Sequence, residues 1–362
     1  MAVGEIAVGG GPSPALPALA PTLEWLELGP DDRTGRFIGL NKDLGRPFNS
    51  AGDGKRIPSG HAYAGMGAAV AWASACRDPL GTAPRQSTET FAARWRALRA
   101  CAPAEPCHYM SLGPGDGRKD GVLLADLSTA NPDLCYLPVD TSEELLHLAI
   151  RGLVRRLGLP TDRVMSLPWD FSFRESVAEI RRLLDELFGA TPVLFSLLGN
   201  TLSHVDDDTA LLRLLSTLLR PSDRLLLEVE ATTAVTEHLA TIAAGEQSQS
   251  PTYGDFVTSA LRHHTDLHVA WDEIELVGSV EPDRALVTKT LYRADEDMVL
   301  TLPNRARTRF RFDDTIRLAL SRKYSPEGLA DLIDDAGLSI LADVCTSTDG
   351  PFGLALLMME RA

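Results

Sequence analysis

The stretch YMSLGPGDGRKDGVLL, Tyr109 to Leu124, predicts a strand, a tight turn and a helix in direct succession. A short apolar run ends at three alternate glycines, Gly113, Gly115 and Gly117, and a second apolar run follows a basic pair. Glycine adopts left-handed backbone conformations at no steric cost and lets a ligand approach the main chain closely. We therefore expect this turn to lie against a cofactor.

The spacing of the glycines bears on which cofactor this is. A dinucleotide fingerprint places its third glycine three residues after the second, and that position is Arg118. The pattern GxGxG suits a cofactor whose uncharged middle lies along the turn. A nicotinamide-dependent oxidoreductase and a purely structural strand-to-helix turn stay open as alternatives, although Arg118 argues against the first.

From Tyr109 onward, strand-like and helix-like segments alternate. Strands separated by helices of such length predict a doubly wound, mainly parallel sheet. Thr141 and Glu144 are spaced as a capping box for one of the helices. The strand-like runs are 108–112, 135–139, 163–167, 192–198 and 223–230, and the helix-like runs are 119–127, 143–157, 174–188 and 208–219.

The carboxyl-terminal segment has a different rhythm. Ser325 and Pro326 predict the cap and the first residue of a helix over 326–337. The apolar runs 338–345 and 352–359 flank a polar turn and predict a hairpin. A parallel sheet that closes in this way is typical of a methyltransferase core. We therefore predict an α/β fold: a doubly wound, Rossmann-like, seven-stranded methyltransferase sheet with an antiparallel last strand.

A second, smaller α+β substrate domain or lid is expected beside this core. Residues 23–84 precede the alternating segments, and residues 235–320 interrupt them with three strand-like runs. We expect these two regions to pack together over the carboxyl ends of the core strands, where such folds bind ligands. The core then comprises 85–234 and 321–362, and residues 1–22, rich in Pro and Gly, are expected to be a disordered tail.

Composition excludes several classes of partner. The net charge of −15 over 362 residues argues against a nucleic-acid surface and favours a small or cationic partner. No apolar run approaches the roughly 20 residues that span a bilayer. Five scattered cysteines without CxxC spacing predict reduced thiols in a cytoplasmic protein and no metal site. His264 and His268 would share a helix face, which we interpret as solvated polar surface. The oligomeric state stays open.

Acidic residues follow two of the predicted strands. Asp140 stands at the tip of the second strand, where a carboxylate accepts hydrogen bonds from the ribose hydroxyls of an adenosine. The alternative is a carboxylate that favours the start of the next helix. Asp170 and Phe171 follow the third strand, and an acid beside an aromatic ring suits an adenine. A capped turn with a core Phe is the alternative there.

Four motifs in order, SLGPGDGRK, YLPVDTS, LLGNTLSH and LSRKYSPEGLADLIDDAGL, resemble the S-adenosylmethionine (SAM)-dependent methyltransferases that trimethylate histidine in ergothioneine biosynthesis. The likeness spans residues 109–362 and extends to SGHAYAGMGAAVAWASACRDP in 59–79. It implies SAM as the methyl donor and S-adenosylhomocysteine as the product. By this resemblance the methionine part of SAM contacts Gly113, Gly115 and Lys119, the ribose Asp140, and the adenine Asp170 and Phe171.

The substrate pocket of that family transfers less completely. An asparagine grips the amino-acid head group in the histidine enzymes, and His204 stands at that place here. A glutamate that binds the imidazole precedes a serine in the family. Here the serine is Ser321 and the glutamate position is Ala319. Because an unpaired buried N–H costs about 1–3 kcal/mol, we expect an acceptor other than histidine.

Glu228 and Glu230 alternate onto one face of the strand 223–230. Two carboxylates at the ligand-binding end of the sheet could hold a guanidinium, and a solvated edge is the alternative. We therefore expect an N-methyltransferase of a small amino-acid-like cation in specialised metabolism, with arginine as the leading acceptor. An O- or C-methyltransferase and a non-catalytic SAM-binding protein stay open. The proton acceptor is expected to be Glu230 or His204, and the expected substrate-binding residues are Tyr63, His204, Glu228, Glu230 and Ser321.

Overall fold

The computed structural model describes residues 39–63, 65–77, 88–247, 250–302, 305–347 and 350–362. The expected tail over 1–22 and the beginning of the expected second domain lie outside these residues. Within the described part of the chain, every helix is too short or too polar to cross a lipid bilayer.

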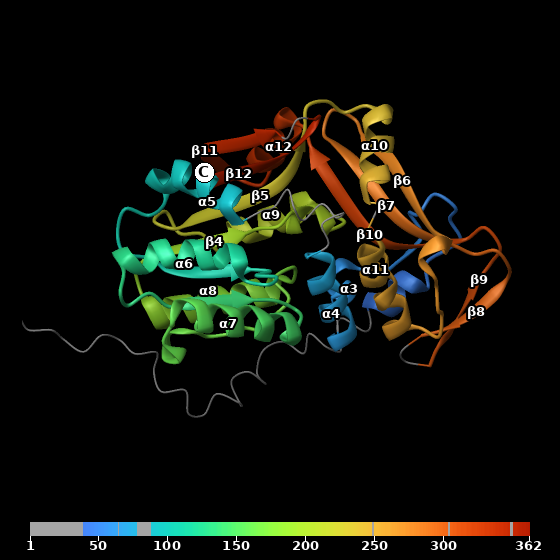
Figure 1. Cartoon of the computed structure of the whole chain (residues 1–362), viewed down its shortest axis with the longest axis horizontal. Helices are drawn as coiled ribbons and strands as arrows, with labels where there is room; N and C mark the ends of the chain where they lie inside the picture. Colours follow the sequence, from blue (N-terminus) through green and yellow to red (C-terminus); the bar gives the residue numbers. More distant parts are fainter. Residues whose placement is uncertain (1–38, 64, 78–87, 248–249, 303–304, 348–349) are drawn as a thin grey trace, which may run out of the picture.

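One mixed sheet runs through the middle of the protein (Figure 1). Its first part has the strand order β3-β2-β4-β5, with all neighbours parallel. Strand β12 lies antiparallel beside β5, and β11 lies antiparallel beside β12. The predicted α/β fold with an antiparallel last strand is confirmed. These strands are β2 (His108–Leu112), β3 (Tyr136–Val139), β4 (Val193–Leu197), β5 (Arg224–Thr232), β11 (Leu338–Ser347) and β12 (Phe352–Arg361).

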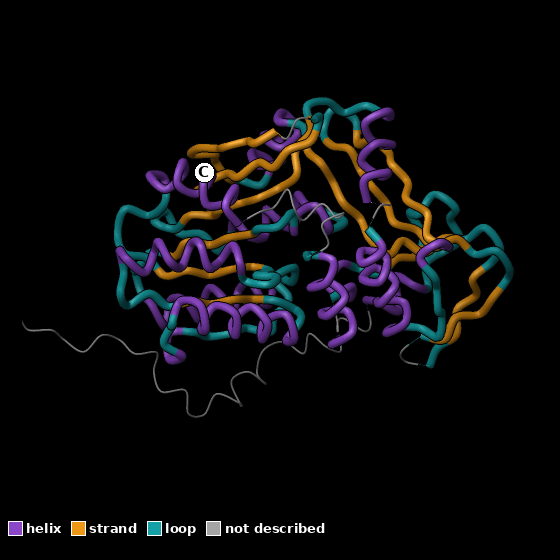
Figure 2. Tube along the Cα trace, viewed as in Figure 1, coloured by secondary structure: helices purple, strands orange, loops and turns teal. Residues whose placement is uncertain are grey.

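Helices cover both faces of this part of the sheet, as Figure 2 shows. Helices α5, α6 and α7 contribute to the apolar cluster on one face, and α8, α9 and α12 to the cluster on the other. These helices are α5 (Thr88–Leu98), α6 (Arg118–Ala130), α7 (Glu143–Leu157), α8 (Arg174–Phe188), α9 (Asp208–Ser216) and α12 (Pro326–Asp335).

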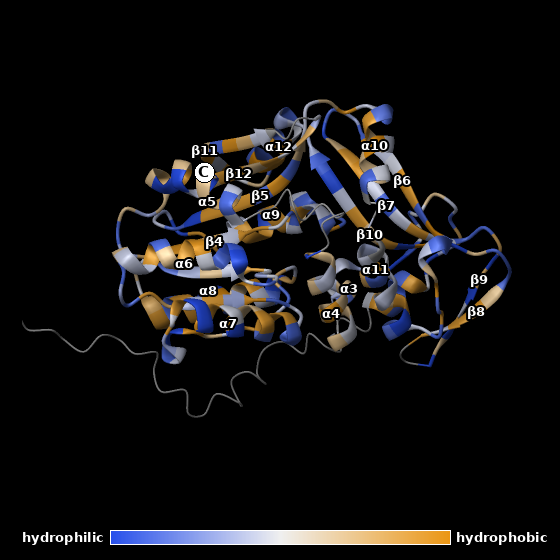
Figure 3. Cartoon of the chain, in the orientation of Figure 1, coloured by the Kyte–Doolittle hydropathy of each residue, from blue (hydrophilic) through white to orange (hydrophobic). Residues whose placement is uncertain are grey.

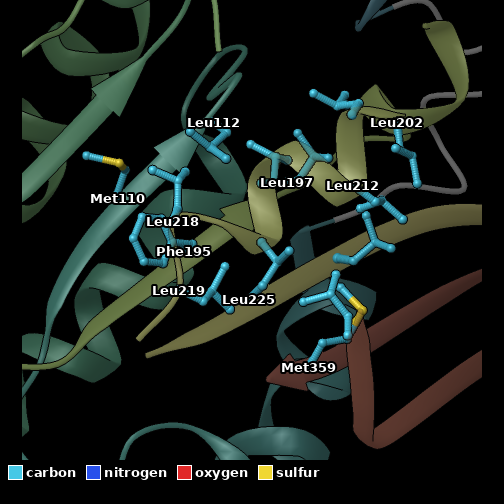
Figure 4. Close-up of a cluster of buried hydrophobic side chains, with 14 of the residues drawn as sticks. Met110, Leu112, Phe195, Leu197, Leu202, Leu212, Leu218, Leu219, Leu225 and Met359 are labelled. Atoms are coloured by element: carbon cyan, nitrogen blue, oxygen red, sulfur yellow. The ribbon is translucent and has the colours of Figure 1, made fainter. Parts of the chain in front are cut away.

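Successive residues of a strand point to opposite sides of the sheet, and helices cover each side, so apolar side chains of the strands are buried on both faces. In β4, Leu194 packs into one cluster, and Phe195 and Leu197 into the other. Figure 4 shows the second cluster, where Leu212 of α9 lies beside Leu197. Strands β4 and β5 accordingly carry mostly hydrophobic colours between helices with hydrophilic outer faces (Figure 3). The packing of the core thus holds the carboxyl ends of the parallel strands β2, β3 and β4 next to one another at one edge of the sheet.

Several helix predictions match the structure. Helices α7 and α8 cover the predicted 143–157 and 174–188. Ser325 caps α12 as predicted, because its hydroxyl accepts a hydrogen bond from the N–H of Gly328 at 3.0 Å.

The predicted cap of α7 is wrong by one residue. The N-cap is Ser142, whose hydroxyl accepts from the N–H of Leu145 at 3.3 Å. Thr141 instead donates its hydroxyl hydrogen to the carbonyl of Gly60 at 3.4 Å, a contact with a distant part of the chain.

The predicted strand over 163–167 forms only two isolated bridges to β3. Pro138 lies in the middle of β3 and its carbonyl accepts from Leu167. Its nitrogen would donate back toward Met165, but proline has no N–H. The ladder is therefore interrupted at this edge of the sheet.

The second part of the sheet extends beyond β5. The end of β10 pairs with β5 through Tyr324 and Ala231, and β7 and β6 follow in antiparallel order. The expected domain boundary at 320/321 falls inside β10, which joins both parts. The elements here are β1 (Lys55–Arg56), β6 (Ile274–Glu281), β7 (Ala285–Arg293), β8 (Met298–Thr301), β9 (Arg307–Phe310), β10 (Thr315–Tyr324), α3 (Ser59–Ala62), α4 (Gly65–Ala75), α10 (Glu237–Gln247) and α11 (Pro251–His264).

Helices α3 and α11 lie beside β10, and α4 packs against α11, between the core and the outer strands (Figure 1). Helix α11 ends at His264, so His268 does not share its face, and that prediction is wrong. His264 is buried, and its Nε2 lies 3.1 Å from the carbonyl oxygen of His61. This contact joins α11 to α3.

Candidate active site

Two adjoining cavities lie where the two parts of the sheet meet. The glycine-turn cavity, of about 210 Å³, faces the carboxyl ends of β2, β3 and β4. The β10 cavity, of about 170 Å³, lies against β5 and β10 on one side and α3, α4 and α11 on the other. The residues that line both cavities are Ser59, Tyr63, Trp72, Cys76, Gly199 and His204.

The glycine turn forms the floor of the first cavity. Gly113 and Gly115 have φ angles of +73° and +59°, a region that other residues rarely adopt. A Cβ at Gly115 would stand 2.7 Å from the indole of Trp72. Helix α4 therefore closes directly onto the turn, and a side chain at position 115 has no room.

Two buried carboxylates stand at the strand tips beside this turn. Asp140 follows β3, and its Oδ1 accepts from the N–H of Ser142 at 2.9 Å. Burial, together with the negative charge of Asp170, raises the pKa of Asp140 to about 6. Asp170 accepts from the N–H and the hydroxyl of Ser172 at 2.9 and 2.6 Å.

All the predicted cofactor residues line the glycine-turn cavity, which places the two acids, an aromatic ring and a bare main chain around one space. Such a set fits an adenosine with an extended amino-acid tail. These residues are Gly113, Gly115, Lys119, Asp140, Asp170 and Phe171.

Glu228 lines neither cavity among the described residues. Its buried carboxylate accepts from Arg94 Nη2 at 2.7 Å, from Lys119 Nζ and from the N–H of Gly199 at 2.8 Å. Burial alone would raise the pKa of Glu228, but the cations Lys119 and Arg94 hold it below its ordinary value. The expected pair of carboxylates facing an acceptor does not form, because α5 and α6 supply two cations at the level of Glu228.

Glu230 lines the β10 cavity. Its Oε2 accepts from Lys323 Nζ at 2.7 Å, and both side chains are buried. The N–H of Glu230 donates to Oδ1 of Asn200 at 2.9 Å, and Nδ2 of Asn200 lies 3.4 Å from Oγ of Ser321. Asn200, which the sequence did not single out, thus joins β5 to β10 at the cavity wall.

His204 lies at the junction of the two cavities. Its Nδ1 is 2.8 Å from the carbonyl oxygen of Leu320. Because a carbonyl only accepts, Nδ1 carries the hydrogen, and Nε2 of the neutral ring carries the lone pair. Burial lowers the pKa of His204 below its ordinary value, although the charge of Glu230 acts in the opposite direction. The junction therefore holds a neutral base.

The tyrosines divide between the cavities and the core. Tyr63 lines both cavities, and burial raises the pKa of its phenol. Tyr253 lines the β10 cavity, and its hydroxyl lies 3.1 Å from Oγ1 of Thr290. Tyr324 is buried elsewhere and donates to Asp208 at 2.7 Å.

The wall of the β10 cavity includes Ala319 and Ser321, two positions that the sequence had singled out. Arg317 and Asp206 also line it, and the sequence gave no reason to place them there.

The model of the family described as histidine-specific, SAM-dependent methyltransferases matches residues 49–359. This range includes every described residue that lines the two cavities. A search of curated proteins found no match.

Solved structures of methyltransferases are similar to the chain at low identity. One is a SAM-dependent methyltransferase from Clostridium acetobutylicum (12% identity, TM-score 0.39, 76% of this chain and 92% of that chain). Another is magnesium protoporphyrin IX methyltransferase from Synechocystis PCC 6803 with bound S-adenosylhomocysteine (14% identity, TM-score 0.37, 77% of this chain and 83% of that chain). A third is a glycopeptide N-methyltransferase complexed with SAM (14% identity, TM-score 0.34, 74% of this chain and 92% of that chain).

Proposed function

The chain belongs to the family of histidine-specific, SAM-dependent methyltransferases, and from this premise we propose that it methylates a nitrogen of a small amino-acid-like acceptor other than histidine. The observation that carries the proposal is the junction of the two cavities. There the neutral base His204 adjoins the glycine-turn cavity, and Ala319 replaces the expected imidazole-binding carboxylate in the β10 cavity.

SAM, the methyl donor, supplies an activated methyl group on its sulfonium when bound, so alignment contributes much of the acceleration. The residues of the glycine-turn cavity fit it. Gly113, Gly115 and Lys119 would hold the methionine part, and Asp140 would accept from the ribose hydroxyls. Asp170 and Phe171 would hold the adenine.

The acceptor nitrogen must lose a proton. His204 offers Nε2 for this, because Nδ1 is committed to the carbonyl of Leu320. Glu230 lies in the β10 cavity with one oxygen, Oε2, bonded to Lys323, so Oε1 is the oxygen that would orient an N–H of the acceptor. Arginine is the acceptor that we propose first, and of the two glutamates only Glu230 supports it, because Glu228 does not line the cavity among the described residues.

Histidine should be a poor acceptor. Ala319 cannot accept the imidazole N–H, and the unpaired donor should cost about 1–3 kcal/mol, or roughly 5- to 150-fold in kcat/KM. A screen of amino acids and guanidino compounds with isotopically labelled SAM measures this directly. Ala319→Glu should raise turnover of histidine, whereas Ala319→Gln, similar in size and uncharged, should raise it less. Robust turnover of histidine by the wild type would contradict this account of the pocket.

The same screen separates the remaining alternatives. Label found on an oxygen or a carbon of the product would identify an O- or C-methyltransferase. Binding of SAM without transfer to any compound would support the non-catalytic protein.

Affinity for SAM should fall as the pH falls below about 6. Hydroxyl groups donate to the ionised form of Asp140, whose pKa is raised to about 6, so protonation competes with binding. Affinity at pH 5 should be about tenfold below that at pH 8. Calorimetry on the wild type and on Asp140→Asn measures this, because the variant should lose most of the dependence on pH.

The raised pKa of Asp140 has the opposite effect on folding: the contribution of Asp140 to stability increases as the pH falls through 6. Weaker binding of SAM at pH 5 would therefore not reflect a loss of folding stability caused by the protonation of Asp140.

A cytoplasmic location and a small-molecule partner complete the proposal. All five cysteines are unpaired, which suits a reducing compartment. The net charge of −15 does not suit a nucleic-acid partner.

A further inference from the structure

Arg317 is a buried arginine in the wall of the β10 cavity. Its side chain is 9% exposed, and it lies on β10 next to an irregularity in the pairing with β7 between positions 317 and 319. Such a bulge redirects side chains and is frequent next to binding sites. Five consecutive residues of β10, 317–321, line the cavity on either side of this irregularity.

The partners of Arg317 leave it with donors to spare. Its Nη2 bonds to Oδ1 of Asp206. The same oxygen lies 3.1 Å from Nη1 of Arg56, whose Nε lies 3.2 Å from Oδ1 of Asp43, and Asp43 also accepts from Arg46 at 2.6 Å. In the described part of the chain this network joins three guanidinium groups to two carboxylates. One positive charge is therefore in excess, and a guanidinium has five N–H donors.

Among the residues that the structure describes, the other charges around the β10 cavity cancel. Glu230 is paired with Lys323, and His204 is neutral. A second network is also balanced, with two cations on two anions: Arg322, Arg284, Glu281 and Asp208. The excess charge at the cavity wall thus belongs to the network of Arg317.

We infer that the acceptor carries a carboxylate and that Arg317 binds it. This inference rests on the proposed function and narrows its substrate class to carboxylate-bearing acceptors. A planar guanidinium binds a carboxylate through two parallel hydrogen bonds, and the partly buried setting strengthens them. The acceptor then enters as an amino acid, with its acid group on Arg317 and its reactive nitrogen toward His204. An amine without an acid group leaves the charge of Arg317 without a partner.

The test compares acids with their amides. L-arginine and L-argininamide, followed by the other common L-amino acids and their carboxamides, are titrated calorimetrically into protein saturated with S-adenosylhomocysteine, so that no turnover occurs. The best-bound acid should bind about 100-fold more tightly than its amide. In Arg317→Met the acid should lose that factor and the amide should not, so the preference disappears. Arg163→Met is the control: Arg163 is paired with Asp133 and, among the described residues, lines neither cavity, so the preference for the acid should stay.

Equal binding of an acid and its amide by the wild type, or an undiminished preference in Arg317→Met, would overturn the inference and leave N-methylation standing. If Arg317→Met does not fold, Arg317→Lys replaces it: the charge is kept but the two-pronged geometry is lost, and the preference should shrink about tenfold. Label transfer to an oxygen of a bound acid would instead refute N-methylation and leave the role of Arg317 intact. Methylation of amines that lack a carboxylate, with no acid bound, would refute the inference.

Discussion

Asp140→Ala should weaken binding of SAM by about 2–4 kcal/mol, which is about 30- to 900-fold in Kd. The substitution removes the carboxylate that we propose accepts two ribose hydroxyls, and it does so at a buried position where water does not replace it fully. Calorimetry with SAM or S-adenosylhomocysteine measures the loss. The unliganded protein should keep its melting temperature, because burial already disfavours the charge of Asp140 in the folded state.

Asp126→Ala is the matched control for this variant. Asp126 lies on α6, the helix that begins at the glycine turn, but it bonds to Arg99 and Trp95 away from the cavity. The variant Asp126→Ala should bind SAM with the same affinity as the wild type. Unchanged affinity in Asp140→Ala, or tight binding of NAD by the wild type, would contradict the assignment of the glycine-turn cavity.

Glu230→Gln should lower turnover at least about a hundredfold while affinity for SAM holds. The glutamine keeps the shape but removes a buried charge, and breaking a buried pair in this way costs roughly 3–5 kcal/mol. Glu230 faces the β10 cavity and lies near His204, whose pKa its charge raises. Loss of that charge therefore weakens both the orientation of the acceptor and the base. Steady-state kinetics with the acceptor found in the screen measure the effect.

The pairing of Glu230 with Lys323 requires a second variant. In Glu230→Gln the ammonium of Lys323 stays buried without a counter-charge, so the protein should also lose stability. The double variant Glu230→Gln/Lys323→Met removes both charges and should regain much of the melting temperature. If Glu230 acts on the acceptor, turnover in the double variant stays low. Turnover that returns with stability would show that Glu230 only neutralises Lys323.

The sequence alone determined the features that depend on neighbouring residues. The helices over 143–157 and 174–188 follow from the apolar period and their length, and the cap at Ser325 from a Ser-Pro pair. Gly113 and Gly115 follow from the strand-turn-helix pattern, because a turn that needs positive φ selects glycine locally. The parallel order of the strands then brings Asp140 and Asp170 to the same end of the sheet, which places the six predicted cofactor residues around one cavity. Their contacts with SAM stay a prediction.

The tertiary structure decided which charges meet. Alternation along β5 places Glu228 and Glu230 on one face, but it does not say what lies against that face. Arg94 and Lys119, 134 and 109 residues away, neutralise Glu228, whereas Lys323 and the β10 cavity receive Glu230. Likewise the carbonyl of Leu320 selects the tautomer of His204, and the network of Asp206 presents Arg317 to the cavity. The protonation and the free donors of a buried group depend on partners that arrive from distant segments, and no local pattern encodes them.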